Sequence, residues 1–404
     1  INDATTDTLN NLIVEGSSNS VASGVIFIST TTGTTGNDNI RIENCDIKEA
    51  GSNYPANGIF SLGTSTKTND NIVVKGCNIY NYFLPSATTA HGGVYASSHN
   101  SAWTVENNKF FQTASRTYTS AAQPITAIYI GNATGQGSGF TVKGNTIGYS
   151  SASGTGTMTY TSTAAIQYAG IVMNVLASPV SEVSNNTIRN ISFTSTSGGT
   201  ANWGLFSGIH IFSGGVNVIN NAVGDTSGTG SISVSLNTNN GGFVNGIKND
   251  GAGPVKVYNN RIGSIYAEGG SGTNVGVSLF GIYATTGNMA IRGNQIGSDA
   301  SANNMRVGSL GLTSNSNNLV GIRLASTTNT YTDTIVNNRI SNLRQGNTGA
   351  TSAFLKGIHT EGANGLFYIE GNQVSGLYSD PAITGTGLSA AVIGIAHAAT
   401  GVPY

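Results

Sequence analysis

The chain has 404 residues and a formal net charge of −1, and only 9% of its residues are charged. Nucleic-acid binders displace counterions with a basic surface, so the balance of 17 basic against 18 acidic residues excludes that class of protein. The 38% hydrophobic fraction, rich in Ile and Val, excludes a disordered chain, and no apolar run reaches the roughly 18 residues of a membrane span.

The first recurring element is a short segment in which glycine precedes an aliphatic residue. The ten steps from Gly24 to Gly394 cover 370 residues, a mean of 37 per step. Ala127-Ile128 fills the one gap in the series. The copies begin at Gly24, Gly58, Gly93, Gly170, Gly208, Gly246, Gly281, Gly321, Gly357 and Gly394.

A second motif lies between successive copies of the first. It reads aliphatic, any residue, Asn or Gly, Asn or Cys, any residue, aliphatic. Its copies start at Ile42, Val74, Val105, Val142, Val183, Val218, Val257, Ile291, Ile335 and Ile369. A third short apolar segment often follows, as in Ile188-Arg-Asn-Ile191.

Each motif is an alternating β segment too short to be stable alone, and helical periodicity is absent between them. Repeats of this kind predict a solenoid in which each strand pairs with its copy one turn later, about 4.8 Å away. We therefore expect residues 1–404 to form one all-β segment, a right-handed parallel β-helix of about ten turns. Each turn would contain three short strands and long loops of Ser, Thr and Gly.

Asparagine is expected at the corner of each turn because it tolerates the left-handed backbone conformation of a sharp bend. Stacked amides at this corner can hydrogen-bond along the rod. The equivalent positions are Asn108, Asn145, Asn186, Asn221, Asn260, Asn294, Asn338 and Asn372. Cys45 and Cys77 occupy the same position in the first two turns, where we expect stacked free thiols, with a disulfide as the alternative.

This pattern resembles the right-handed parallel β-helix family, the fold of pectin and pectate lyases and of many bacterial surface repeats. The resemblance covers the whole chain and rests on corners such as Asn145-Thr-Ile147 and on the Gly-Ile strands. The loops resemble those of large proteins that Bacteroidota secrete through the type IX system. Neither end of the sequence shows a cap, so we expect a segment of a longer polypeptide.

The residue after each core isoleucine is expected to point outward and to form a column along the rod. Most of this column is aromatic or potentially cationic, which suits sugar stacking and pairing with uronate or sulfate groups. Self-stacking that only stabilises the sheet and a catalytic strip are the alternatives. The candidate ligand-binding residues are Tyr95, Tyr129, His210, Lys248, Asp250, Tyr283, Arg323 and His359.

For catalysis, the resemblance implies either a calcium-assisted lyase with a basic residue or a hydrolase with clustered aspartates. Asp250 and Glu361 lie three turns apart, too far for a carboxylate pair, and no family catalytic motif matches. Asp38 and Asp70 are expected to stack, either as turn residues or as a shared cation site. We expect no catalytic residue, cofactor or bound metal.

The leading functional hypothesis is a structural or adhesive segment of a large exported cell-surface protein. A polysaccharide-binding or lyase-like protein and a phage tailspike or fibre segment are the alternatives. The expected partner is a polysaccharide or another surface, and the expected location is extracellular. Asp7-Thr8-Leu9 and Asp333-Thr334-Ile335 resemble the O-glycosylation motif of Bacteroidota, which makes Thr8 and Thr334 candidate glycan sites.

Overall fold

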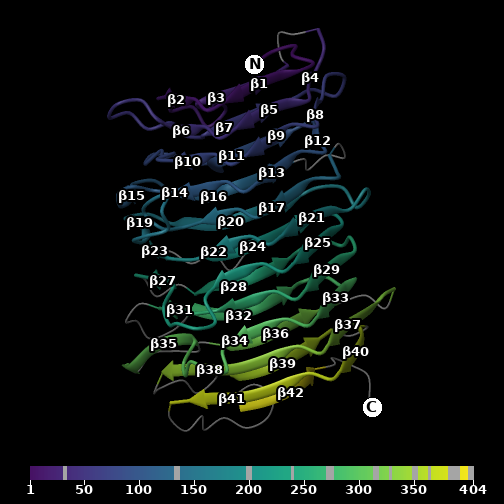
Figure 1. The fold of residues 1–404 in the computed structure, drawn as a ribbon. Helices are drawn as coiled ribbons and strands as arrows, with labels where there is room; N and C mark the ends of the chain where they lie inside the picture. The colour runs from purple at the N-terminus through teal and green to yellow at the C-terminus, as the bar shows by residue number, and fades with distance from the viewer. Residues whose placement is uncertain are drawn as a thin grey trace.

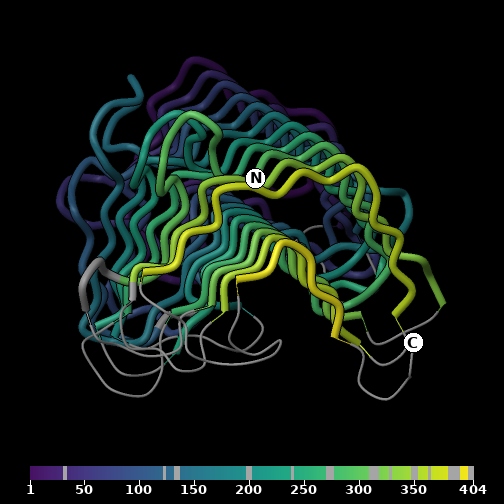
Figure 2. The backbone as a smooth tube through the Cα atoms, turned by 90° about the horizontal axis from the view of Figure 1, so that it is seen from below, coloured from purple at the N-terminus to yellow at the C-terminus, as the bar shows by residue number. Residues whose placement is uncertain are grey.

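A computed structural model confirms the parallel β-helix. It describes residues 1–30, 34–131, 137–196, 203–237, 241–269, 277–312, 318–326, 330–347, 354–362, 365–380 and 392–398. All regular elements in these ranges are β-strands. Successive turns stack along one axis (Figure 1), and their backbones superpose when viewed along it (Figure 2).

The strands that follow the glycines form an eleven-stranded sheet, here called sheet 1. Its strands are β3 (Ile26–Ser29), β7 (Ile59–Leu62), β11 (His91–Ser98), β16 (Ala122–Gly131), β20 (Ile166–Asn174), β24 (Phe206–Ser213), β28 (Gly242–Asn249), β32 (Val277–Ala284), β36 (Leu319–Ala325), β39 (Leu355–Glu361) and β42 (Val392–Ala398).

The second motif forms another eleven-stranded sheet, sheet 2. Its strands are β1 (Asp7–Asn10), β5 (Ile40–Glu43), β9 (Val73–Lys75), β13 (Thr104–Glu106), β17 (Thr141–Lys143), β21 (Ser181–Ser184), β25 (Val216–Ile219), β29 (Val255–Tyr258), β33 (Met289–Arg292), β37 (Thr332–Val336) and β40 (Leu366–Glu370). A small sheet of β4 (Asn37–Asp38), β8 (Asn69–Asp70) and β12 (Asn100–Ser101) lies beside the first turns.

Sheet 3 completes each turn and has two parallel files of strands. The first file follows the Asn corner and contains β2 (Ile13–Gly16), β6 (Asp46–Glu49), β10 (Asn78–Tyr80), β14 (Lys109–Phe111), β18 (Thr146–Ile147), β22 (Thr187–Ile188), β26 (Ala222–Gly224), β30 (Arg261–Gly263), β34 (Gln295–Gly297), β38 (Arg339–Asn347) and β41 (Gln373–Ser379). The second file contains β15 (Arg116–Tyr118), β19 (Met158–Ser162), β23 (Ile191–Ser195), β27 (Ile232–Leu236), β31 (Ile265–Glu268) and β35 (Met305–Leu312), and it joins β38. Three sheets were expected, but the division of the third was not.

The aliphatic side chains of sheet 1 form one continuous internal file. Ile209, Ile247 and Ile282 pair in register and are fully buried. The preceding glycine is required by this packing, because a Cβ on Gly208 would lie 2.5 Å from a methyl of Val223 and 2.7 Å from the next turn's carbonyl oxygen. The repeated dipeptide is therefore a glycine that allows close approach followed by a core isoleucine.

The expected asparagine ladder is present and continuous from Asn108 to Asn372. Asn221 is typical, since its Oδ1 accepts bonds from the backbone N–H and the Nδ2 of Asn186. Its own Nδ2 donates to the carbonyl of Val183 and to Oδ1 of Asn260, at 2.9 and 3.0 Å. The side-chain amide thus uses its two donors and both acceptor sites, as a buried polar group requires.

The ladder asparagines do not themselves adopt the left-handed conformation, so that part of the prediction is wrong. The residue before each one does, for example Asn220 at φ 57° and Gly144 at φ 67°. Only glycine and a few short polar residues enter this region readily, which explains why the motif has Asn or Gly there. The bend and the ladder therefore belong to adjacent residues.

Two further details concern the first turns. Cys45 and Cys77 are free and buried, as expected, with the Cys45 N–H donating to the Cys77 sulfur at 3.4 Å. Burial raises the pKa of the Cys77 thiol to about 12. The first Gly-aliphatic copy is displaced by one residue, since Ile26 rather than Val25 pairs with Ile59.

Candidate functional site

The outward column of sheet 1 has the expected register. Each residue pairs with the corresponding residue of the next turn, so the column is a single file along the rod. The file comprises Phe60, Tyr95, Tyr129, Val172, His210, Lys248, Tyr283, Arg323, His359 and Ala396. Asp250 lies just after β28, beside this file.

The first part of the column is an aromatic stack. The rings of Tyr95 and Tyr129 lie 4.5 Å apart with an interplanar angle of 6°, and the ring of Phe60 lies 5.5 Å from that of Tyr95. Both tyrosines are half-buried. Burial raises the pKa of each phenol, so both stay neutral at physiological pH. Because the ring faces contact each other and the Tyr129 hydroxyl bonds to Tyr95 and Asn174, the exposed ring edges are the parts that remain for a ligand.

The middle of the column is organised around Asp250. His210 Nε2 and Lys248 Nζ each lie 2.8 Å from its Oδ2, and the Thr285 hydroxyl donates to its Oδ1 at 2.8 Å. Burial opposes ionisation of Asp250, but the hydrogen bond from His210 and the nearby positive charge outweigh it and lower the carboxyl pKa. Burial lowers the pKa values of both His210 and Lys248.

This Asp250 group is covered. His210 and Lys248 are 0% and 2% exposed, and the Trp203 ring packs edge-on against His210 at 5.2 Å. The hydrogen bonds from His210 and Thr285 to Asp250 can stabilise the buried ion pair between Asp250 and Lys248. In this conformation neither cation can reach a polymer lying on the sheet.

The last part of the column forms a separate cluster. The Arg323 guanidinium lies 5.1 Å from the ring centre of Tyr283 and pairs with Glu361. Nζ of Lys356 is 3.2 Å from Nε2 of His359. Burial, followed by the Lys356 charge, lowers the pKa of His359 to about 4. Tyr283 and His359 are buried, whereas Arg323 is partly exposed.

The eight predicted ligand residues thus share one face but fall into three groups. Partly exposed members are Tyr95, Tyr129, Asp250 and Arg323. The sequence repeat predicted where the backbones of these residues lie. It did not predict which side chains of irregular segments pack over them, such as Trp203 on His210. Their role in ligand binding stays a prediction.

The remaining sequence candidates lie elsewhere. Asp38 and Asp70 stack in register, and the Asp70 carboxylate accepts hydrogen bonds from Thr68 and Ser101 at 2.6 Å. Within the described residues no three His, Cys, Asp or Glu side chains gather in a way that suits a metal. Thr8 is exposed on β1, and Thr334 is half-buried in β37 between two neighbouring strands. Their glycosylation stays a prediction.

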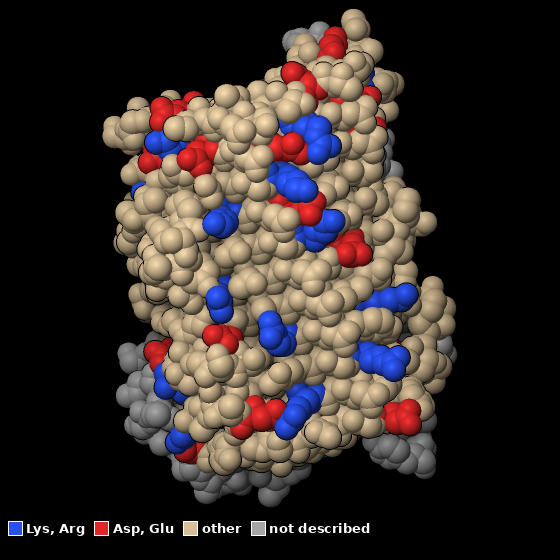
Figure 3. Space-filling view, in the orientation of Figure 1, with Lys and Arg blue, Asp and Glu red and all other residues tan. Residues whose placement is uncertain are grey.

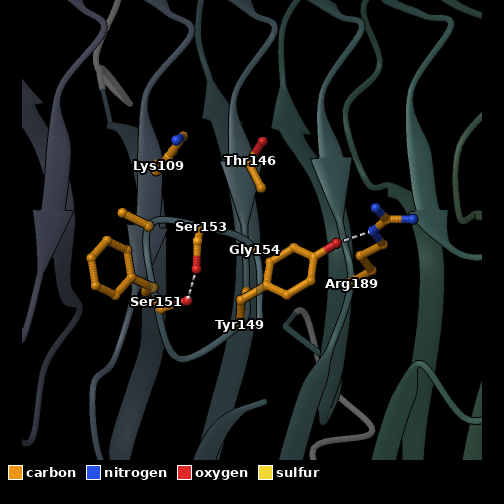
Figure 4. A pocket seen from close by; sticks show the side chains of 10 residues that line it. Lys109, Thr146, Tyr149, Ser151, Ser153, Gly154 and Arg189 are labelled. Atoms are coloured by element: carbon orange, nitrogen blue, oxygen red, sulfur yellow. Dashed lines mark hydrogen bonds between the residues drawn. The ribbon is translucent and has the colours of Figure 1, made fainter. Parts of the chain in front are cut away.

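A pocket that sequence reasoning missed opens on sheet 3, between β14 and the connection that leaves β18. Its volume is about 270 Å³. Lys109 and Thr146 hold the same outward position in neighbouring strands, and Arg189 follows β22 in the next turn. Figure 4 shows Lys109 and Arg189 on opposite sides of the Tyr149 ring. Other lining residues are Phe111, Gly148, Ser151, Ala152, Ser153 and Gly154.

The pocket exists because the chain leaves sheet 3 at Gly148. Gly148 has φ 118°, and a Cβ there would lie 1.8 Å from the Arg189 carbonyl oxygen, so only glycine fits. The chain then makes the excursion 148–157 before rejoining the sheet at Met158. In the next turn, residues 189–190 make the same connection directly. The sequence feature that could have indicated this pocket is the greater length of the connection 148–157 compared with 189–190.

Connections of this kind alternate along the rod. Residues 148–157, 225–231 and 298–304 are long excursions, separated by short connections in the intervening turns. We call these three excursions the corner ridge. The second and third excursions contact each other across the short turn between them, since Asn304 Nδ2 donates to the carbonyls of Asp225 and Gly228 at 3.1 and 2.5 Å.

Charged groups elsewhere are sparse and mixed in sign. Figure 3 shows basic and acidic side chains scattered over a mostly uncharged face. On sheet 2 the Glu106 carboxylate lies 3.7 Å from Lys75 and 3.6 Å from Lys143. Exposed pairs of this kind contribute at most about 1 kcal/mol.

Comparison with family models, curated proteins and solved structures finds no match to this chain. Within the described ranges, no helix has the length and apolar character needed to cross a bilayer.

Proposed function

We propose that this chain is a structural and adhesive segment of a large exported surface protein. The observation that carries the proposal is the asparagine ladder, in which each buried amide is bonded to the turns before and after it. Such a column links the turns from Asn108 to Asn372, so this part of the fold supplies a stiff spacer whose side faces are available for contact. The sparsely charged surface in Figure 3 suits neutral or weakly charged partners.

A bead-detachment assay tests this proposal. Beads coated with residues 1–404 are placed under laminar flow on surfaces coated with neutral or acidic polysaccharides, and the same polysaccharides are assayed for new reducing ends and unsaturated products. We expect retention on at least one surface relative to uncoated beads, with no product formed. Product formation would establish an enzyme and overturn the proposal. Detachment from every surface at the rate of uncoated beads would also overturn it. Sedimentation as a trimer would instead favour a fibre segment.

A second candidate function is polysaccharide binding along the outward face of sheet 1. The partial exposure of Tyr95, Tyr129 and Arg323 in one file supports it. In the same assay, Tyr129→Ala should then reduce retention several-fold. Tyr331→Ala, at an exposed position immediately before β37 of sheet 2, serves as the matched control and should leave retention unchanged. Equal retention of both variants would remove this candidate.

A further inference from the structure

We propose that the pocket between Lys109 and Arg189 binds a single carboxylate-bearing sugar residue. This inference rests on the proposed adhesive function and names a ligand for it. The pocket lies on sheet 3, so it is separate from the outward column of sheet 1.

The charge of the pocket favours an anion. Its lining includes two cations and no acidic residue, in a chain where acids slightly outnumber bases. Lys109 is exposed and forms no ion pair with any described residue. Arg189 is held in place, since its Nε donates to the Tyr149 hydroxyl and its Nη1 lies 3.7 Å from Asp225. A carboxylate entering the pocket can therefore pair with the exposed Lys109 ammonium, while Arg189 adds positive charge and holds the Tyr149 ring from the far side of that ring.

The remaining lining suits a sugar ring rather than a bare anion. Hydroxyl groups of Thr146, Ser151 and Ser153 can both donate and accept, which matches the hydroxyl groups of a sugar. Phe111 and Tyr149 add aromatic carbon to the wall. A volume of about 270 Å³ is far more than an inorganic anion fills and lies just below the range of roughly 300–1,000 Å³ for drug-sized ligands. The size therefore favours one small ring.

Hydrogen bonds within the excursion and to the next turn hold the wall of the pocket in place. The Ser151 hydroxyl bonds to those of Ser153 and Thr155 at 2.9 and 2.8 Å, and the Ser150 N–H donates to the Thr155 carbonyl. Both ends of the excursion are tied to the next turn, because Tyr149 and Met158 donate their N–H groups to the Asn190 carbonyl. An ordered wall lowers the entropy that binding would otherwise cost.

Calorimetric titration of residues 1–404 with sodium glucuronate, glucose and sodium sulfate tests the inference. We expect saturable binding of glucuronate in the millimolar range, with glucose at least tenfold weaker because it lacks the carboxylate. Sulfate should displace bound glucuronate only weakly. Lys109→Gln and Arg189→Gln should each weaken glucuronate binding at least fivefold. Lys256→Gln, an exposed position on sheet 2, is the matched control and should bind as the unaltered chain does.

Each other outcome overturns the inference. Absence of glucuronate binding, or unchanged binding by Lys109→Gln, removes the site. Equal affinity for sulfate and glucuronate reduces it to a general anion site. Far-ultraviolet circular dichroism confirms that the variants keep the β-helix. The calorimetric result does not depend on the bead assay with neutral surfaces. Absence of glucuronate binding would therefore refute the pocket proposal and leave the adhesive function standing. Polysaccharide cleavage in the bead assay would refute the adhesive function and leave the pocket proposal standing.

Discussion

At the residue scale, neighbouring asparagines in each corner motif have different roles. Asn221 is a buried ladder residue, whereas Asn220 is exposed and adopts φ 57°. Asn221→Ala leaves several buried partners unsatisfied and should lower the free energy of unfolding by about 3 kcal/mol. Asn220→Gly keeps the required backbone conformation and should cost less than about 0.5 kcal/mol. Urea unfolding of both variants measures the difference, and equal losses would contradict this division of roles.

His91 predicts a pH dependence of stability. It is fully buried; its Nδ1 donates to the Thr89 carbonyl and its Nε2 accepts from the Tyr118 hydroxyl. Burial lowers the pKa of His91 from 6.5 to about 4. The unfolded chain therefore binds this proton first as the pH falls, and stability is lost between pH 6.5 and 4.

Between pH 7.5 and 5 this histidine should cost the protein about 2 kcal/mol of folding free energy. His91→Gln keeps one donor and one acceptor but does not titrate. Between pH 7.5 and 5 the free energy of unfolding of this variant should therefore fall by about 2 kcal/mol less than that of the unaltered chain. Urea unfolding at the two pH values measures both proteins. Identical pH dependence in the variant would show that His91 is not the group responsible.

At the scale of the element, the corner ridge depends on contacts between excursions two turns apart. Asn304 is fully buried, and its Oδ1 also accepts from the Ser264 N–H at 2.8 Å. Asn304→Ala removes these bonds and should release residues 225–231, raising their cleavage rate in limited proteolysis several-fold. Ser301→Ala removes only one bond, to the Ser227 carbonyl, and should have a smaller effect. Protection of 225–231 in both variants would show that the excursions are independently stable.

The elements also show what sequence could predict. The alternation of glycine–isoleucine segments with Asn corners predicted sheets 1 and 2, because every turn places a side chain in the same environment. The corner ridge and its pocket depend on segments such as 148–157 that do not repeat from one turn to the next. The cover over His210 by Trp203 is likewise a contact of an irregular segment. Periodicity specifies strand register, but it does not specify how nonrepeating segments pack on it.

At the scale of the whole molecule, each turn contacts mainly its neighbours, so a defect should spread only locally. Ile247 is fully buried in the middle of sheet 1. Ile247→Asp places a charge in the core and should remove amide protection from β24, β28 and β32, while β7 and β11 keep theirs. Hydrogen-exchange mass spectrometry measures this, with exposed Lys256→Asp as the control. Uniform loss of protection would show that the rod unfolds as one unit.

The ladder also has a direction. Each amide receives hydrogen bonds from the turn before and gives one to the turn after, as at Asn186, Asn221 and Asn260. A duplicated turn spliced between two others brings its own donor and acceptor in the same orientation, so both junctions are satisfied at once. Gene duplication in whole-turn units can thus lengthen the protein without creating an unbonded polar group, whereas an insertion of half a turn breaks the column.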